Sequence, residues 1–370
     1  MGNPQRHLTV TAIAVCLFSL VSVGRVPSSS SATDVLAQAG RGFTYEHKPM
    51  PKPEGKAVIR VGYFPNLTHA QALIGMSTGA FQKAVGENVI IDPFLFNAGP
   101  SAVEALFAGA LDFTYIGPNP AINAYVRSKG EAVRIVSGAC SGGAALVVRA
   151  DAGVQSATDF RGKRIATPQL GNTQDVAARS WLRKQGLTLK EAGGDVQIIP
   201  MMNPDQLSLF LKKEIDAAWA VEPWAARLMK EGGGRLFLDE RTLWPEGQFV
   251  TVHVLASTKF LKQHADILKM WLGAHVELTH WINSHQGDAK KIVNAEIQKL
   301  VGRGLRADVL DEAVSRMEFT YDPVRSSLVA SAQAAYELGF LGKERTNLSG
   351  IYDLSHLNEV LRGRGLKGVQ

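Results

Sequence analysis

The chain has 370 residues, of which 45% are hydrophobic and 20% are charged, and its formal net charge is +6. This length is enough for two domains, or for one large domain with a substantial core. Because the positive charge is mild and forms no run of like charges, it does not indicate a nucleic-acid-binding groove and is compatible with a small acidic ligand.

Residues 1–39 have the order of a signal peptide. A short basic region precedes an apolar stretch at residues 8–23, which is followed by a Ser-rich segment and by Ala37-Gln38-Ala39. This order of basic, apolar and small-residue regions predicts export. The apolar stretch is short for a membrane span, which makes a membrane anchor the less favoured interpretation.

Residues 40–57 are predicted to be an extended leader, after which short apolar strands alternate with helices. The predicted strands are 58–64, 89–96, 113–117, 133–137, 146–149, 164–167, 196–200 and 217–221. The predicted helices between them include 69–84, 102–108, 121–129, 176–184 and 206–212. From residue 255 onward helices dominate, at 260–283, 289–301, 308–317 and 324–341. Strands that alternate with helices of this length predict parallel sheets with helices on both faces.

Polar turns follow four of the predicted strands, and each turn opens a helix. Ligands of such sheets lie at the carboxyl ends of the strands. Helix starts also present N–H groups without helical partners, and these groups attract anions. The sequence therefore predicts a cleft that binds a small anion through N–H groups and neutral side chains. The candidate residues in these turns are Asn66, Thr68, His69, Gly99, Pro100, Ser101, Pro118, Asn119, Gly171, Asn172 and Thr173.

Asn172 has two possible roles. It is a good N-cap for the helix at 176–184, and it lies in the turn where a ligand is expected. Asp175 is expected at the third helical position, where a carboxylate interacts favourably with the helix dipole. Both roles of Asn172 stay open at this point.

Glu222 and Trp224 lie at a strand-to-helix junction in the segment DAAWAVEPWAARL. Tryptophan is commonly a core residue, but Glu-Pro at a strand end begins a helix at the edge of a site. Both residues are therefore candidates for ligand binding. An ionised Glu222 would repel a bound anion unless a basic group such as Arg227 neutralises it, or the ligand carries its own cation.

The sequence has no P-loop, HExxH or CxxC pattern. His275, His280 and His285 are spaced five apart and fall on different helical faces, which is a poor arrangement for a metal. Cys140 is the one cysteine left after export and is more typical of a small buried residue than of a nucleophile. The sequence thus predicts no enzyme activity, no cofactor and no metal.

Four blocks of the sequence resemble, in order, successive blocks of the ABC-transporter substrate-binding proteins for sulfonates, taurine and nitrate. The likeness runs from about residue 58 to about residue 340. The blocks are VIRVGYFPNLTHAQALIG, NAGPSAVEALFAGALDFTYIGPNPAI, DFRGKRIATPQLGNTQDVAARSWL and EIDAAWAVEPWAARL.

The resemblance implies a type II periplasmic binding protein, an α/β fold in which two α/β lobes enclose a ligand cleft and two crossover segments join them. The first lobe would contain residues 58–142 and 254–370, the latter including the C-terminal helices, and the second lobe residues 143–253. The crossovers would lie near residues 137–145 and 250–257.

The resemblance also implies a function: an extracytoplasmic solute-binding component of an ABC importer, which captures a small oxyanion such as an aliphatic sulfonate. Its partners would be a small anionic or zwitterionic solute and a membrane permease with its ATPase, and no nucleic acid. It would be a monomer located in the periplasm, or at the cell surface of a single-membrane bacterium. Gly171, Asn172 and Thr173 would hold the anionic head, and Glu222 would lie where the family often has a polar side chain that closes the cleft.

Other ligands stay open. Many sulfonate binders have Gly-Ser-Ser or Gly-Thr-Ser and then a histidine where this chain has Gly171-Asn172-Thr173 followed by Gln174 and Asp175. Because Glu222 is also acidic, a zwitterion such as taurine becomes a more favoured ligand. Nitrate, bicarbonate and a pyrimidine precursor of thiamine are further alternatives. An enzyme that resembles thiamine-pyrimidine synthases is less favoured, because it needs a cysteine-rich segment. A transcription regulator would need a DNA-binding helix-turn-helix at one end.

Overall fold

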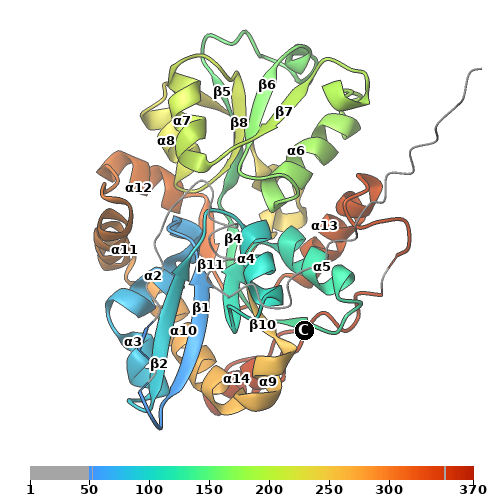
Figure 1. The fold of residues 1–370 in the computed structure, drawn as a ribbon. Helices are drawn as coiled ribbons and strands as arrows, with labels where there is room; N and C mark the ends of the chain where they lie inside the picture. Colours follow the sequence, from blue (N-terminus) through green and yellow to red (C-terminus); the bar gives the residue numbers. More distant parts are fainter. Residues whose placement is uncertain (1–49, 52, 346) are drawn as a thin grey trace, which may run out of the picture.

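The structure is a computed structural model that describes residues 50–370, apart from residues 52 and 346. The predicted signal peptide and most of the predicted leader therefore lie outside the described residues. Figure 1 shows two lobes, one above the other, each with a central sheet flanked by helices. No helix within the described part of the chain is long and apolar enough to span a bilayer.

The first lobe contains a six-stranded mixed sheet with the strand order β11-β4-β10-β3-β1-β2. Strand β1 pairs in parallel with β2 and β3, whereas β10 runs antiparallel to both β3 and β4. The prediction of purely parallel sheets is therefore wrong, because β10 comes back from the second lobe in the opposite direction. The strands are β1 (Ala57–Tyr63), β2 (Val89–Leu95), β3 (Phe113–Ile116), β4 (Val133–Gly142), β10 (Val250–Ser257) and β11 (Met317–Phe319).

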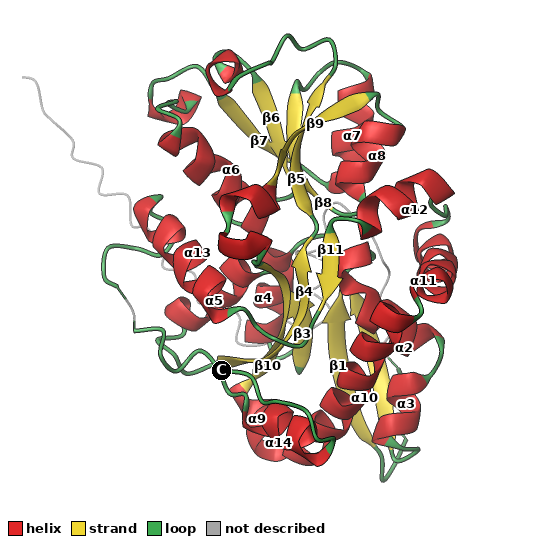
Figure 2. Cartoon of the chain, turned by 180° about the vertical axis from the view of Figure 1, so that it is seen from behind, coloured by secondary structure: helices red, strands yellow, loops and turns green. Residues whose placement is uncertain are grey.

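Helices cover both faces of this sheet (Figures 1 and 2). The first half of the chain contributes α2 (Ala70–Ser77), α3 (Ala80–Val85), α4 (Gly99–Phe107) and α5 (Pro118–Arg127). The second half contributes α9 (Thr258–Gln263), α10 (Ala265–Ser284), α11 (Gln286–Val301), α12 (Ala307–Val314), α13 (Arg325–Glu337) and α14 (Ser355–Gly363).

The second lobe contains a five-stranded sheet with the order β7-β6-β8-β5-β9. Here β6 pairs in parallel with β7 and β8, and β5 runs antiparallel to β8 and β9. The strands are β5 (Ala144–Arg149), β6 (Arg164–Thr167), β7 (Gln197–Pro200), β8 (Ala217–Val221) and β9 (Gly234–Asp239), and the helices are α6 (Thr173–Lys184), α7 (Asn203–Leu211) and α8 (Trp224–Lys230).

All eight predicted strands are present, but several predicted helices are wrong in their bounds. The helix predicted at 69–84 is a 3-10 turn (Leu67–His69) followed by α2 and α3, which are separated because Gly79 has a φ of 73° in the left-handed region. The helix predicted at 308–317 ends at Val314, and β11 begins at Met317. Strands β9, β10 and β11 and helix α14 were not predicted.

Two segments join the lobes. The chain first crosses between the end of β4 and the start of β5, and it returns through residues 240–249 before β10. Because all of β10 pairs within the first lobe's sheet, the boundary predicted at residue 253 falls inside this strand and lies too far along the chain.

The C-terminal part of the first lobe reaches the second lobe on two sides. Helix α12 packs against α8 on one side, and α13 packs against both α5 and α6 on the other. Both views show α12 and α13 on opposite edges of the molecule at the level where the lobes meet (Figures 1 and 2). Residues late in the sequence can therefore contribute side chains to the interface between the lobes.

Two buried histidines of the first lobe hydrogen-bond to backbone carbonyls. The Nε2 atom of His253 lies 3.0 Å from the carbonyl oxygen of Pro323, and that of His275 lies 2.9 Å from that of Gly138. Burial lowers the pKa of each imidazole to about 4, since the interior disfavours the charged form. Both side chains are thus neutral in the folded protein at neutral pH.

Replacing His253 with glutamine is expected to change the pH dependence of stability. A histidine whose pKa is lowered on folding stabilises the fold above its unfolded pKa of about 6.5, and this contribution is lost as the pH falls toward 4. At pH 5.5 the unfolded wild type therefore takes up about one proton at His253 that the folded protein excludes. When the free energy of unfolding in urea is measured as a function of pH, the glutamine variant should take up about one proton fewer on unfolding than wild type does. An unchanged pH slope would contradict this assignment.

Candidate functional site

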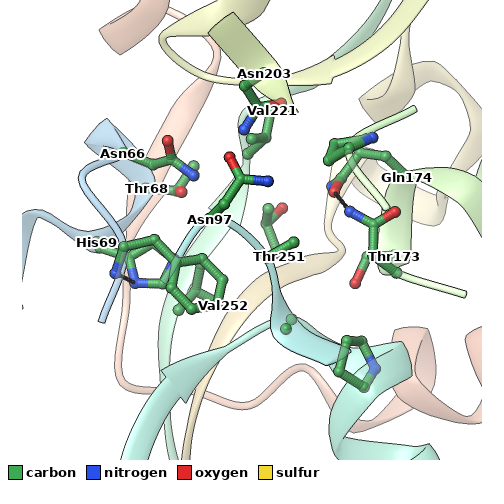
Figure 3. A pocket seen from close by; sticks show the side chains of 17 residues that line it. Asn66, Thr68, His69, Asn97, Thr173, Gln174, Asn203, Val221, Thr251 and Val252 are labelled. Carbon is green, nitrogen blue, oxygen red and sulfur yellow. Dashed lines mark hydrogen bonds between the residues drawn. The ribbon is translucent and has the colours of Figure 1, made fainter. Parts of the chain in front are cut away.

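A cavity of about 30 Å³ lies between the two lobes, which is space for a group of a few atoms. Figure 3 shows polar side chains from both lobes that point toward this space. The walls come from the ends of several strands and the starts of α4, α6 and α7, as the strand-end rule predicts. The lining residues are Phe64, Asn66, Thr68, His69, Asn97, Ala98, Gly99, Gly117, Pro120, Pro168, Asn172, Thr173, Gln174, Asn203, Val221, Thr251 and Val252.

The sequence-predicted candidates divide into two groups. Those that line the cavity are Asn66, Thr68, His69, Gly99, Asn172 and Thr173. Those that are not among the lining residues are Pro100, Ser101, Pro118, Asn119, Gly171, Glu222 and Trp224. Four polar lining residues were not among the candidates: Asn97, Gln174, Asn203 and Thr251.

The signal for three of these missed residues was present in the sequence. Asn97 and Gln174 belong to the same polar turns as the candidates, and Asn203 begins α7 directly after β7. Thr251 lies inside β10 and reaches the cavity only because that strand returns to the first lobe.

The amide of Asn66 is held in one orientation from the opposite lobe. The indole N–H of Trp224 donates to Oδ1 of Asn66 over 3.0 Å. An indole nitrogen can only donate, so the oxygen of Asn66 faces Trp224 and its NH₂ group is left for another partner. Trp224 therefore orients a lining residue without lining the cavity itself.

A short chain of hydrogen bonds orients Gln174 in the same sense. The backbone N–H of Asp175 donates to Oδ1 of Asn172 over 2.9 Å, which is the predicted N-cap. The remaining NH₂ group of Asn172 donates to Oε1 of Gln174 over 3.2 Å (Figure 3). The NH₂ group of Gln174 is the part of its amide that this chain leaves for a ligand.

His69 is a neutral donor. The backbone N–H of Phe64 donates to Nδ1 of His69 over 3.3 Å, which assigns the ring proton to Nε2. Burial lowers the pKa of His69 to about 3, so the ring stays uncharged at neutral pH.

Two threonine hydroxyls complete the set of available groups. Thr68 and Thr173 are buried, and neither Oγ1 atom has a hydrogen-bond partner among the described residues. Gly117 permits the lobes to approach at Thr173, because a Cβ atom at Gly117 would lie 2.4 Å from Oγ1 of Thr173. Buried hydroxyls without partners are costly, which points to a ligand that satisfies them.

The available groups are therefore mostly donors. The NH₂ groups of Asn66 and Gln174 and the Nε2–H of His69 are joined by hydroxyls and by the free N–H groups of helix first turns. None of the lining residues is a lysine, arginine, aspartate or glutamate. Such a cavity suits a ligand whose atoms accept hydrogen bonds, and neutral donors can neutralise a small anion in this way.

The expectation that Glu222 faces the ligand is not supported by its position. Its side chain is fully buried, and Oε1 lies 2.8 Å from both Nε and Nη2 of Arg316. Its other oxygen accepts from the backbone N–H of Ala226 over 3.0 Å. The predicted partner Arg227 instead pairs with Glu231 at 3.0 Å. Glu222 thus joins the lobes through Arg316, which sequence reasoning missed.

The carboxylate of Asp175 is also occupied by the protein. It accepts hydrogen bonds from the Thr167 hydroxyl, the backbone N–H of Gly171 and the Arg179 guanidinium, over 2.8, 2.9 and 3.0 Å. Neither acidic residue is therefore placed to receive an amine of the ligand.

Cys140 and His275 are not among the lining residues. Cys140 is buried in β4, where burial raises the pKa of its thiol and suppresses the thiolate. His275 is buried and hydrogen-bonded to Tyr115 over 3.0 Å. Within the described residues, no group of histidine, cysteine, aspartate and glutamate side chains is arranged to hold a metal ion.

Replacing Asn172 with alanine is expected to lower the free energy of unfolding by about 1 kcal/mol through loss of the N-cap. The same change should weaken the binding of a hydrogen-bond-accepting ligand in the cavity beyond this loss, because Gln174 loses the donor that orients it. Asn172→Ser keeps a capping oxygen but no amide, so it should retain stability and still bind more weakly. Calorimetry and urea unfolding separate the two effects. Equal affinities of wild type and both variants would show that Asn172 only caps.

Comparisons with known proteins support the two-lobed α/β fold described above. A model of the NMT1-like family matches residues 52–297. A curated binding protein of Brucella abortus is 35% identical over 161 residues, which are 43% of this chain and 46% of the relative. The chain thus spans about half the length of the curated relatives that it matches.

Two solved structures extend the likeness to most of the chain. The alkanesulfonate-binding protein of Xanthomonas axonopodis pv. citri, bound to MOPS, has a TM-score of 0.66 at 19% identity, covering 81% of this chain and 99% of that chain. The periplasmic nitrate-binding protein of Synechocystis PCC 6803 has a TM-score of 0.70 at 15% identity, covering 85% of this chain and 90% of that chain. At these identities the comparison shows the fold, which is that of two-lobed periplasmic binding proteins.

Proposed function

The chain belongs to the NMT1-like family, and from this premise we propose that it is the solute-binding component of an ABC importer and holds a small oxyanion between its lobes. The donor set of the cavity carries the proposal. Protein groups occupy the amide oxygens of Asn66 and Gln174 and the Nδ1 atom of His69, so each of these side chains offers the ligand an N–H.

The same donor set favours some oxyanions over others. Sulfonates and nitrate present only acceptor oxygens, and the two solved relatives are named for these ligands. A pyrimidine with an amino group would place a donor against donors, which is unfavourable. Taurine carries an ammonium group, and the lining has no carboxylate to receive it. The proposed ligand is thus a plain oxyanion, with taurine, bicarbonate and a pyrimidine as less favoured alternatives.

The proposal includes the cellular setting. The signal-peptide pattern of residues 1–39 supports export. Outside the cytoplasm, the mature chain would act as a monomer that closes on its ligand and delivers it to a membrane permease with its ATPase. The proposed activity is binding without turnover, so prolonged incubation should return the ligand chemically unaltered. Recovery of a modified ligand would contradict this part.

A thermal-shift screen of the mature chain tests the ligand class. Binding to the folded state alone stabilises it by about 2.7 kcal/mol at a ligand concentration of 100 Kd, which raises the melting temperature. We expect a rise with alkanesulfonates or nitrate, and a smaller or no rise with taurine, bicarbonate and the pyrimidine. A rise with the pyrimidine alone would overturn the oxyanion proposal.

A further inference from the structure

We propose that Trp224 determines the ligand selectivity of the cavity by fixing the amide of Asn66 across the lobe interface. The inference rests on the proposed function, and it goes further by assigning the discrimination between acceptor and donor ligands to one hydrogen bond. Trp224 begins α8 in the second lobe, and Asn66 lies in the turn after β1 in the first lobe. Their contact over 3.0 Å joins residues that are 158 positions apart.

An asparagine amide presents either an acceptor or a donor to a ligand, depending on a half-turn of its end group. The two orientations have nearly the same shape, so packing alone does not separate them. A partner that can only donate does separate them, because one orientation would place two donors against each other. Asn66 is 4% exposed, so water competes little for this hydrogen bond.

The other two oriented donors are held within their own lobes. Gln174 is oriented by Asn172 of the second lobe, and His69 by the backbone of Phe64 in the first lobe. Their orientation therefore does not require the lobes to meet. Asn66 differs, since its orienting partner is in the opposite lobe.

It follows that closure completes the donor set. When the lobes separate, the amide of Asn66 is free to turn, and the cavity accepts either kind of ligand at that position. When they close, Trp224 selects the orientation in which Asn66 donates, and an acceptor ligand is retained while a donor-bearing one is rejected. Trp224 is thus a positioning residue that acts through Asn66.

Trp224→Phe is the most direct test. Phenylalanine keeps an aromatic ring beneath the Arg227 guanidinium, which lies 4.7 Å from the Trp224 ring centroid, and removes the pyrrole part of the indole together with its N–H group. The probes are methanesulfonate, with acceptor oxygens only, and methanesulfonamide, a neutral compound of similar shape that carries an NH₂ donor. Calorimetry on each protein gives the ratio of the two affinities.

Wild type should prefer methanesulfonate, and Trp224→Phe should reduce this preference by at least about tenfold, the size expected for one hydrogen bond to a charged group. The variant should bind methanesulfonamide more tightly and methanesulfonate more weakly than wild type does. A merely structural role of Trp224 would weaken both probes alike. Trp281→Phe, on α10 and outside the cavity lining, is the matched control and should leave the ratio unchanged.

Asn66→Asp tests whether the Asn66 amide donates to the ligand. Aspartate still accepts from the indole N–H and replaces the NH₂ group by a second oxygen, so the preference should shift to methanesulfonamide even if Trp224→Phe does not fold. An unchanged ratio in Trp224→Phe, or in Asn66→Asp, overturns the inference and leaves the proposed function standing. A wild type that binds neither methanesulfonate nor nitrate overturns both.

Discussion

Replacing Arg316 with methionine is expected to lower the free energy of unfolding by about 3–5 kcal/mol, because it leaves a buried carboxylate without its counter-charge. Arg316 is 4% exposed and Glu222 is fully buried, and two guanidinium nitrogens lie 2.8 Å from Oε1 of Glu222. Arg316 also pairs with Glu312 at 2.5 Å. Equilibrium unfolding in urea at pH 7 measures the effect.

The double variant Glu222→Gln/Arg316→Met separates the pair from a packing defect. It removes both charges, so it should recover most of the stability that Arg316→Met loses. Arg127→Met is the control on the surface, where the ion pair with Glu104 is half exposed and should contribute at most about 1 kcal/mol. A loss below about 1 kcal/mol in Arg316→Met would show that the carboxylate finds another partner or a proton.

Because Glu222 pairs with Arg316, the variant Glu222→Gln does not measure the charge of the ligand, as it would if Glu222 faced the ligand. With Glu222 facing a ligand, the variant would report whether that ligand carries an amine. Glu222 instead contacts Arg316 between the lobes, so the variant removes one of the two carboxylates that pair with this cation and leaves Glu312. A loss of affinity in Glu222→Gln would therefore report on lobe closure rather than on the charge of the ligand.

Replacing Gln174 with glutamate is expected to weaken methanesulfonate or nitrate binding by at least about a hundredfold, which is about 2.7 kcal/mol. The two side chains have the same shape, and the bond from Asn172 to Oε1 can remain. The other oxygen replaces a donor and adds a negative charge to a cavity whose lining has none. The lost hydrogen bond and the repulsion of the anion are each on the order of 1.5–3 kcal/mol.

Gln169→Glu is the matched control for this variant. Gln169 lies in the turn before α6, donates to the Ser101 hydroxyl over 3.4 Å and is not among the lining residues. The same chemical change there should alter affinity by less than about threefold, since the added charge is partly solvated. Calorimetry on both variants decides the matter. If Gln174→Glu binds the anion within tenfold of wild type, Gln174 is not a donor to the ligand.

Much of the fold and part of the site could be predicted because they rest on local patterns. Short apolar runs between helical segments predicted eight strands that are present. Polar turns at strand ends predicted six of the seventeen lining residues, including Asn66, His69 and Asn172. The N-cap of α6 is a bond between residues three apart, and such a bond is readable from the sequence.

The errors concern features that depend on distant segments. The first lobe's sheet is mixed because β10 returns from the other lobe, and the second lobe's sheet is mixed because β5 runs antiparallel to β8 and β9. The direction in which a strand enters a sheet cannot be read from its own residues. The unpredicted β11 has three residues and pairs at the edge of a sheet, where little apolar periodicity is required.

Local sequence patterns specify the alternation of strands and helices, the neutral polar turns at the strand ends and the helix cap at Asn172. The physical reason is that hydrophobic period, turn chemistry and capping act over a few residues. The long-range partners of the buried polar groups depend on the tertiary structure. Arg316 neutralises Glu222 from 94 residues away, and Trp224 orients Asn66 from 158 residues away. Which long-range partner meets a buried charge or amide depends on how the two lobes pack, because such contacts require the complete fold.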